Sequence, residues 1–509
     1  MRSVAVLLSL VLSCGPGGRG GDGDSDADGD ADADGDADGD GGADADADSD
    51  ADSDADSDAD TDGDADSDAD GDADCGGQGS VTAGAGDRLL LRGTVVTPDE
   101  VLPDAEVLIE GNAIACVGDC AKDAGDATIV ETAGTIFPGL VDAHNHVEYN
   151  WLPPWQPPRL YTNRGQWQAS DEYAEFIRPF RDDDGESTCP MSKYGEIRAL
   201  VGGTTTIQGT PLRRCIQGLV RNVEHADGYS GLGDDHTRTN VLGVDTVGGE
   251  DAADIRAEMD SGETTAYVIH LGEGLDETSR AELDDLVALD LLTAATVVIH
   301  GTAFGEEEWA LMAQAGAKLV WSPRSNLVLY GDTTDVPGAL DAGVTVALAP
   351  DWTPSGSPSI LQELRAADEH DDDAWGDVLS PRDLVRMVTA DAAAVLAIED
   401  QVGTIAPGLR ADLTVVGCTA GDPYAALGQA RLGDVRLVLV DGVPLYGDED
   451  LMESTPLQYC EPIEICGVQK SICVKSSEDP ADQHDQTIAD VEAALAAADL
   501  EVWALSQCD

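Results

Sequence analysis

The stretch "TAYVIHLGEGLDETSRAELDDLVALDLLTAATVVIHGT", residues 265–302, decides the fold. Its two ends, "TAYVIHLG" and "TVVIHGT", are short apolar runs that are typical of buried strands. Between them, "RAELDDLVALDLL" has the apolar spacing of an amphipathic helix. A buried strand, a helix and a second buried strand indicate parallel strands that are covered by helices.

The same alternation continues on both sides of this stretch. Further strand-like segments are "GTIFPGLVDAHNH", "TTTIQGT", "TNVLGVDTV", "KLVWSPRSN" and "VTVALAPDW", and a further helical segment is "EEEWALMAQAG". Roughly seven or eight strand and helix units over about 260 residues close naturally into a barrel. The sequence therefore predicts an α/β fold, a (β/α)8 TIM barrel over residues 137–400.

Polar side chains stand where these strands stop. His144 and His146 end the first strand and point to the same face, because residues i and i+2 of a strand do so. The other strand ends carry His270 with Glu273, His300, Ser325 with Asn326, and Asp351. A single histidine after a strand is more often a core or turn residue. Four of the eight histidines at strand ends, which meet at one mouth of a barrel, instead favour a functional site.

Short alternating segments flank the barrel region. Residues 79–136 and 401–455 have the Gly and Pro punctuation of small antiparallel strands, which predicts one small β-sandwich built from both flanks. Residues 456–509 form a Cys-containing appendage, and four of the eleven cysteines lie there. Disulfides are expected in an exported chain, but their pairing stays open. The final helix packs either on the domain or on a second copy in a homodimer.

The first residues have the pattern of an export signal. "MRSVAVLLSLVLSC", residues 1–14, has an arginine and then an apolar run that is too short to span a bilayer. It resembles a bacterial lipoprotein signal, with Cys14 as the lipidated first residue of the mature chain. The expected location is the bacterial cell envelope or surface, where the lipid on Cys14 is the membrane anchor. Ordinary secretion is the alternative.

The acidic residues are concentrated in one segment. The chain has 101 acidic and 27 basic residues, a formal charge of −74, and aspartate occupies nearly every second position from residue 22 to residue 74. Residues 15–78 are therefore expected to be a disordered, Asp-rich linker. "DADADG" at 30–35 matches the opening of a calcium-binding EF-hand loop, but the twelfth position is Gly41, which favours a spacer. The acidity argues against nucleic acid as a partner.

Five motifs in a fixed order carry a family resemblance. They are "PGLVDAHNH", "HLGEG", "IHGT", "SPRSN" and "APDWTPSG". In this order they resemble the amidohydrolase superfamily, above all its cytosine deaminase, guanine deaminase and triazine chlorohydrolase branch. The flanking "EVLIEGNAIACVG" and "VGTIAPGLRADLTVV" are similar to the β-domain of these proteins, so the resemblance covers about residues 87–447. It implies a metal-dependent (β/α)8 barrel with a small β-sandwich.

The resemblance also implies a ligand set for one divalent metal ion. The ligands would be His144, His146, His270 and Asp351, a set that suits zinc and tolerates ferrous iron. Two-metal members use a bridging carboxylate, often a carboxylated lysine, on a middle strand. The corresponding segment, "TNVLGVDTVGG", contains no lysine, which favours one metal.

Three residues receive catalytic roles from the same resemblance. The metal would lower the pKa of a water molecule, and Asp351 would accept the proton of that water. Glu273 would carry a proton to a ring nitrogen or to the leaving group. His300 would orient the water and stabilise the developing oxyanion.

An aromatic insertion, residues 149–180, follows the first two histidines. It is either a wall of the substrate site or a packed excursion over the core. The candidate substrate-binding residues are Trp151, Arg164, Trp167, Ser325 and Asn326. An arginine here could bind an anionic group of the substrate or pair with a surface carboxylate.

The sequence thus predicts a metal-dependent hydrolase that acts on carbon–nitrogen bonds other than peptide bonds in a small molecule. Deamination of an aminated heterocycle is the first interpretation. The alternatives are hydrolysis of a cyclic amide, a side-chain amine or a halide, or a catalytically idle, surface-exposed binding protein. The presence of Glu273, His300 and Asp351 together favours the enzyme.

Overall fold

The structure, a computed structural model, describes residues 77–178, 188–209, 218–225, 232, 236–240, 242–417, 421–475, 485–498 and 501–508. All of them belong to one compact unit, Asp70–Asp509. The predicted signal, its Cys14, and the acidic linker except its last two residues lie outside the described residues. Within the described ranges, no helix is both long enough and apolar enough to cross a membrane.

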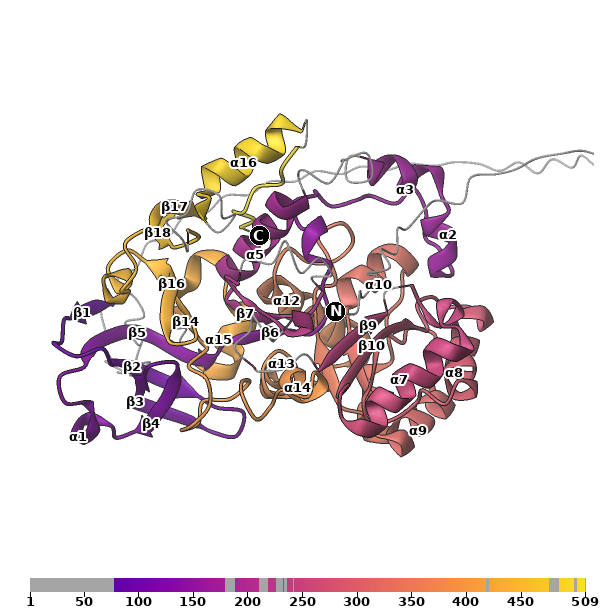
Figure 1. The fold of residues 1–509 in the computed structure, drawn as a ribbon, viewed down its shortest axis with the longest axis horizontal. Helices are drawn as coiled ribbons and strands as arrows, with labels where there is room; N and C mark the ends of the chain where they lie inside the picture. The colour runs from indigo at the N-terminus through magenta and orange to yellow at the C-terminus, as the bar shows by residue number, and fades with distance from the viewer. Residues whose placement is uncertain are drawn as a thin grey trace, which may run out of the picture. The chain divides into compact units, whose positions relative to one another are not determined.

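Five parallel strands form the first sheet, in the order β13-β12-β11-β10-β9. Their bounds are β9 Thr237–Asn240, β10 Ala266–Leu271, β11 Thr296–His300, β12 Lys318–Trp321 and β13 Val346–Leu348. Helices alternate with these strands along the chain: α7 Gly249–Ser261, α8 Glu277–Ala288, α9 Glu306–Ala315, α10 Pro323–Tyr330 and α11 Val336–Ala342. Figure 1 shows α7, α8 and α9 together beside β9 and β10. The expectation of parallel strands alternating with helices is confirmed.

A second parallel sheet contains β6 Leu140–Asp142, β7 Thr204–Ile207 and β8 Arg221–Asn222. Helix α5 Thr188–Val201 precedes β7, and the short helices α2 Arg164–Gln168 and α3 Asp171–Phe176 precede α5. A parallel bridge between Asn145 and Asp351 joins the segments that follow β6 and β13. The described residues thus form a TIM-barrel-like α/β fold from two sheets. They contain no ladder between β8 and β9, so the closed barrel stays a prediction.

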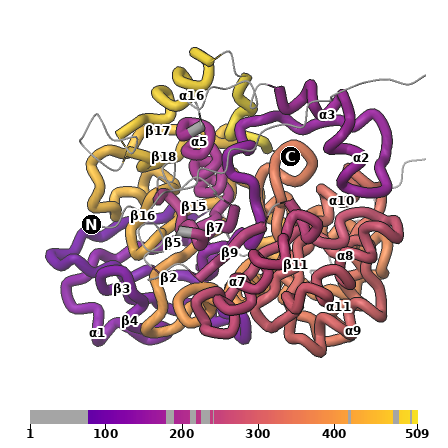
Figure 2. Tube along the Cα trace, turned by 45° about the vertical axis from the view of Figure 1, so that its right-hand side comes forward, coloured from indigo at the N-terminus to yellow at the C-terminus, as the bar shows by residue number. Residues whose placement is uncertain are grey.

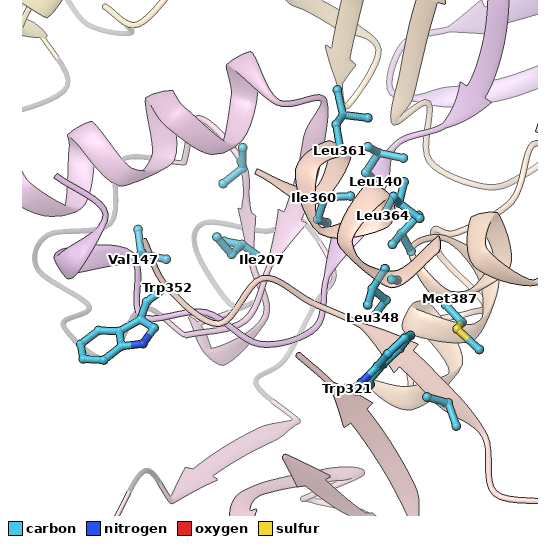
Figure 3. Packing of buried hydrophobic residues seen from close by; sticks show 14 of the residues in the cluster. Leu140, Val147, Ile207, Trp321, Leu348, Trp352, Ile360, Leu361, Leu364 and Met387 are labelled. Atoms are coloured by element: carbon cyan, nitrogen blue, oxygen red, sulfur yellow. The ribbon is translucent and has the colours of Figure 1, made fainter. Parts of the chain in front are cut away.

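Alternate strand residues face different hydrophobic clusters, as the two-residue period of a strand requires. Val268, Val297 and Ile299 lie in one buried cluster with small residues of the neighbouring strands. Their neighbours Ile269 and Val298 lie in the large cluster that also contains helix residues. Figure 3 shows the packing of this large cluster, in which Ile360, Leu361 and Leu364 of α12 Ile360–His370 lie close to Leu140 and Leu348. Both faces of the parallel strands are therefore buried.

The two flanks of the chain join in one ten-stranded sheet. Its path is β17-β18-β16-β15-β14-β5-β2-β3-β4, and β1 pairs with β5. The early strands are β1 Ser80–Thr82, β2 Leu89–Val96, β3 Val101–Glu110, β4 Ala113–Gly118 and β5 Thr128–Pro138. The late strands are β14 Leu413–Gly417, β15 Val435–Val440, β16 Val443–Asp448, β17 Glu461–Ile465 and β18 Val468–Ile472. Both flanks share a buried cluster that includes Val107 and Val415. The arrangement of these strands as a β-sandwich stays a prediction.

Three predicted elements differ from the structure. The segment expected to be one strand into the first histidine pair is split at Gly139 into β5 and β6. A Cβ atom at Gly139 would lie 2.2 Å from Thr205 Oγ1, so glycine allows the chain to pass from one sheet to the other. The strand expected at 239–247 ends at Asn240 and is followed by a 3-10 turn, Val244–Thr246. The "SPRSN" motif opens helix α10 instead of extending a strand, because Pro323 stands at the first helical position.

The C-terminal segment is fastened to the parallel-strand region. Helix α16 Ile488–Ala497 lies beside α5 (Figure 1, Figure 2). Beyond it, the Trp503 backbone N–H donates to Trp151 O at 2.8 Å, and Arg198 Nη2 donates to Trp503 O at 2.5 Å. A disulfide between Cys466 and Cys508 ties this segment to the β17–β18 hairpin. The C-terminal segment thus contacts Trp151, near the start of the aromatic insertion.

We predict that the Cys466→Ser/Cys508→Ser double variant is less stable than the parent chain. This disulfide closes a loop with a sequence separation of 42, for which chain entropy predicts a loss of about 4 kcal/mol. The matched control removes the Cys116–Cys120 disulfide, which has a separation of 4 and an expected loss of about 2 kcal/mol. The midpoints of urea unfolding would measure both, and equal shifts would contradict the prediction.

Candidate metal and catalytic site

Four histidines and one aspartate gather at the carboxyl ends of the parallel strands. His144 and His146 follow β6, His270 lies in β10, His300 ends β11, and Asp351 follows β13. The ring centroids of His144 and His270 are 4.7 Å apart, and those of His144 and His146 are 5.0 Å apart. The structure therefore brings together the four histidines and the aspartate that the sequence predicted to meet at the strand ends.

Asp351 is the centre of one potential ligand group. Its Oδ1 lies 3.2 Å from His144 Nε2 and 3.4 Å from His146 Nε2. The ligand atoms of these three residues lie within 4.8 Å of one another, and so do those of His144, His270 and His300. The two groups share His144, so the five side chains surround one small space.

The charges of these residues fit metal ligation. Burial lowers the pKa of His146 to about 4 and holds the pKa of His270 well below its usual value. Burial alone would raise the pKa of Asp351, but the hydrogen bond and charge of His144 hold it below its usual range. Burial alone would lower the pKa of His144, but the hydrogen bond and charge of Asp351 raise it above its usual value. Neutral imidazoles and an ionised carboxylate are the forms that bind divalent metals, so His144 would release its proton when an ion binds.

An unpaired buried nitrogen provides a second test of the fit. Among the described residues, His270 Nδ1 is buried without a hydrogen-bond partner, whereas the buried His144 Nε2 faces Asp351 Oδ1 at 3.2 Å. Leaving such an atom unpaired costs about 1–3 kcal/mol, a cost that a bound metal ion would offset. His144 Nδ1 lies 3.2 Å from Gln208 Oε1, which leaves Nε2 as the atom that faces Asp351. Histidine nitrogens with a carboxylate are a donor set that suits zinc.

Glu273 faces this group from the loop after β10. Its Oε2 lies 3.8 Å from His300 Nε2 and 3.9 Å from Arg164 Nε. Its other oxygen, Oε1, accepts a hydrogen bond of 2.7 Å from the Tyr330 hydroxyl. Glu273 is 4% exposed, so its carboxylate is buried beside the group of imidazoles.

Two residues of α10 hydrogen-bond the side chains of Asp351 and His300. Ser325 Oγ donates to Asp351 Oδ2 at 2.6 Å, and Asn326 Oδ1 lies 3.1 Å from His300 Nδ1. Both Asp351 and His300 have positive φ angles, 67° and 73°. Non-glycine residues in this region are strained, and such strain is concentrated at functional sites. Ser325 and Asn326 therefore orient the Asp351 and His300 side chains.

The site opens into a cavity of about 530 Å³. Aromatic side chains form one wall of the cavity: Tyr149, Trp167, Tyr173 and Trp352. Polar and charged residues that line it include Arg164, Gln208, Glu224, Thr237, Arg238 and Thr239. A volume of this size accepts a small organic molecule.

The predicted substrate-binding residues occupy different places. Arg164 and Trp167 line the cavity, as the interpretation of the insertion as a wall requires. Within the described residues, Trp151, Ser325 and Asn326 are buried and are not part of the lining. Trp151 belongs to the large hydrophobic cluster, so the insertion both packs on the core and forms a wall.

Sequence reasoning missed several residues of the site, among them Gln208, Trp352 and Tyr330. Gln208 directly follows β7 and Trp352 directly follows Asp351, so their positions at strand ends could have indicated them. Tyr330 is the last residue of α10, and nothing in its sequence context points to the contact with Glu273.

Comparisons with known proteins agree with this geometry. Residues 250–445 match the amidohydrolase family. A 5-methylthioadenosine/S-adenosylhomocysteine deaminase of Desulfitobacterium hafniense is 25% identical over 422 residues, which cover 74% of this chain and 97% of that protein. The enzyme of the same name from Halobacterium salinarum is 27% identical over 436 residues, with coverages of 76% and 96%.

Two solved structures share the fold. A zinc-bound adenosine deaminase of Xanthomonas campestris aligns with a TM-score of 0.60 at 20% identity, over 70% of this chain and 92% of that one. An atrazine chlorohydrolase of Arthrobacter aurescens in complex with zinc aligns with a TM-score of 0.58 at 21% identity, over 70% and 95%. Together, the family match and the curated relatives support the amidohydrolase superfamily for this chain, and with it an enzyme that hydrolyses carbon–nitrogen bonds.

Proposed function

We propose that the protein deaminates an aminated heterocycle, with a purine nucleoside of the adenosine type as the first substrate class to test. The observation that carries this proposal is the position of Glu273 beside His300, against a group of imidazoles and a carboxylate that fits a metal. The names of the curated relatives support the substrate class. The cavity volume and its aromatic wall suit a planar ring system.

His144, His146, His270 and Asp351 would hold one divalent ion, with zinc as the first choice and ferrous iron as the alternative. The contacts of Asp351 with His144 and His146, and the 4.7 Å between the ring centroids of His144 and His270, support this set. Such an ion supplies a water molecule whose pKa is lowered toward neutrality. Asp351 accepts a proton as the water attacks. Ser325 binds its Oδ2, so Oδ1 faces the site and is the oxygen that receives the proton.

The reaction balances with one water per substrate. The water oxygen forms a bond to the ring carbon that carries the amino group, and the carbon–nitrogen bond to that group breaks. Glu273 gives a proton to a ring nitrogen and a carbonyl group results, while the amino group leaves as ammonia after it gains a proton. The two protons of the water replace those delivered to substrate and leaving group.

His300 is the residue that orients the water. Asn326 Nδ2 lies 3.2 Å from both Thr333 Oγ1 and Thr334 Oγ1, so its Oδ1 faces His300 Nδ1. Nδ1 therefore carries the hydrogen in the neutral ring, and burial keeps the ring neutral by lowering its pKa. Nε2 is then free to accept a hydrogen bond from the attacking water. Once protonated, the same nitrogen stabilises the developing oxyanion.

Two other activities compete with deamination on this fold. Hydrolysis of a cyclic amide, a side-chain amine or a halide would use the same Asp351 and Glu273. Among these alternatives, the structural likeness to an atrazine chlorohydrolase supports hydrolysis of a halide. A catalytically idle binding protein would not need a buried Glu273 beside His300. The carbon–nitrogen reaction is therefore the first to test.

The remaining sequence expectations stay proposals. We propose that residues 1–14 direct export, that Cys14 is lipidated, and that the acidic linker holds the folded unit away from a membrane, with secretion as the alternative. The apolar run before Cys14 supports export. We also propose a closed (β/α)8 barrel with a β-sandwich from the flanks, which the eight parallel strands and the joined flanks support. A homodimer is a further proposal, and because the apolar residues of the final helix pack within the chain, it would use another surface.

We predict that His270→Ala loses the metal. Removal of one of four ligands from a site of this type weakens binding severely, so the metal content is expected to fall from about one to nearly zero per chain. The control is His236→Ala, because His236 is exposed and bonds only a backbone carbonyl among the described contacts. Mass spectrometry of elements in the purified, full-length chain measures both. Undiminished metal in His270→Ala would contradict the ligand set.

We further predict that Glu273→Gln keeps its metal and loses turnover. The introduced amide would retain the shape of the side chain but could not carry a proton, so kcat is expected to fall by about 10²- to 10⁴-fold. Release of ammonia from 5′-methylthioadenosine measures the rate, and Glu277→Gln, at an exposed position of helix α8, is the control. A fully active Glu273→Gln variant would overturn the mechanism.

A further inference from the structure

We propose that Tyr330 is a positioning residue for Glu273, whose Oε1 it holds so that the proton is exchanged through Oε2. The contact is direct, because the Tyr330 hydroxyl lies 2.7 Å from Glu273 Oε1. The inference rests on the proposed function, in which Glu273 carries a proton. It adds a residue outside the five family motifs, and it assigns different tasks to the two oxygens of one carboxylate.

The direction of the hydrogen bond is fixed by a third residue. Trp167 Nε1 lies 2.9 Å from the Tyr330 oxygen, and an indole N–H can only donate. The Tyr330 oxygen is therefore the acceptor of this bond. A phenol has one hydrogen, and Tyr330 directs it to Glu273 Oε1, which must accept. The proton of a neutral Glu273 consequently resides on Oε2.

Oε2 is the oxygen that faces the reaction. It lies 3.8 Å from His300 Nε2, whereas Oε1 points to Tyr330. Arg164 Nε lies 3.9 Å from the same Oε2, which orients the carboxylate further without occupying Oε1. Tyr330 thus prevents the carboxylate from turning, so that the oxygen that carries the proton stays directed toward the substrate space.

Burial makes this arrangement effective. Tyr330, Glu273 and Trp167 are 3%, 4% and 6% exposed, so water does not compete for their hydrogen bonds. Burial, with the nearby charge of Glu273, also holds the pKa of Tyr330 well above its usual value. The phenol therefore remains a hydrogen-bond donor over the pH range of an assay.

Backbone hydrogen bonds connect the segments that carry these three residues. The Arg164 N–H donates to Glu273 O at 3.1 Å, and the Leu275 N–H donates to Thr162 O at 2.7 Å. On the other side, the Tyr161 N–H donates to Leu329 O at 2.8 Å. The insertion is thus bound both to the Glu273 loop and to the end of α10. This geometry explains how a side chain of the insertion, Trp167, can fix the orientation of a proton carrier in the loop after β10.

The test compares Tyr330→Phe with the parent chain, with 5′-methylthioadenosine as the probe and ammonia release as the readout. Loss of a hydrogen bond to a charged group is expected to lower kcat by about 10- to 100-fold, while KM changes by less than about twofold because the phenol is not part of the cavity lining. Metal content and melting temperature are expected to match the parent. The control is Tyr446→Phe, a buried tyrosine of β16 whose hydroxyl has no partner among the described residues.

A double variant separates positioning from packing. If Tyr330 acts through Glu273, Glu273→Gln/Tyr330→Phe should be as slow as Glu273→Gln alone, within about twofold, as measured in single turnover with enzyme in excess. The same fold loss in both backgrounds would show a packing effect and overturn the inference. A kcat within twofold of the parent for Tyr330→Phe, beside an inactive Glu273→Gln, would also overturn it and leave the proposed function intact. A fully active Glu273→Gln would instead remove the proposed function, and the inference with it.

Trp167→Phe provides a second variant should Tyr330→Phe fail to fold. It keeps an aromatic ring in the wall, removes the N–H that fixes the phenol, and replaces the indole by a smaller ring. Because the Tyr330–Glu273 contact remains possible, kcat is expected to fall by about two- to fivefold, and the loss should disappear in the Glu273→Gln background. Parental kcat in Trp167→Phe, or a loss that persists without Glu273, would count against the arrangement.

Discussion

The site depends on one constraint: a buried carboxylate must meet two imidazoles that come from the other end of the parallel-strand region. Asp351 follows the last of these strands and the histidine pair follows the first. The backbone bridge between Asn145 and Asp351, with the His146 N–H donating to Asp351 O at 2.9 Å, holds the two segments in register. Without that bridge, neither the short distances from Asp351 to His144 nor the strained backbone of Asp351 would persist.

The sequence predicted those parts of the fold that depend on local pattern. Apolar runs and helical periodicity located β10, α8, β11 and α9. The polar residues at strand ends indicated the four histidines and the aspartate that lie close together in the structure. The pattern failed where a single tertiary contact decides the structure. Gly139 splits a strand because Thr205 packs against it, and Tyr330 reaches Glu273 from the end of α10. Such contacts join distant residues and leave no periodic signal.

The aromatic insertion connects the core, the cavity and the C-terminal segment. Its first part, with Trp151, is buried in the large cluster and binds the backbone of Trp503. Its later part, with Trp167, lines the cavity and contacts the α10 residue that binds Glu273. A substitution in the hairpin or in the last residues can therefore alter the cavity wall through packed contacts, without touching any residue that binds substrate.

The pairing of the ten-stranded sheet sets the order in which the protein can fold during synthesis. Strand β5 lies between β2 and β14, and Ile136 pairs with Val415, about 280 residues later in the chain. At ~5–20 residues per second, the ribosome needs on the order of tens of seconds to supply β14. During that time β5 has an unpaired edge that could pair with other chains. The ten-stranded sheet can therefore be completed only after most of the chain has been synthesised.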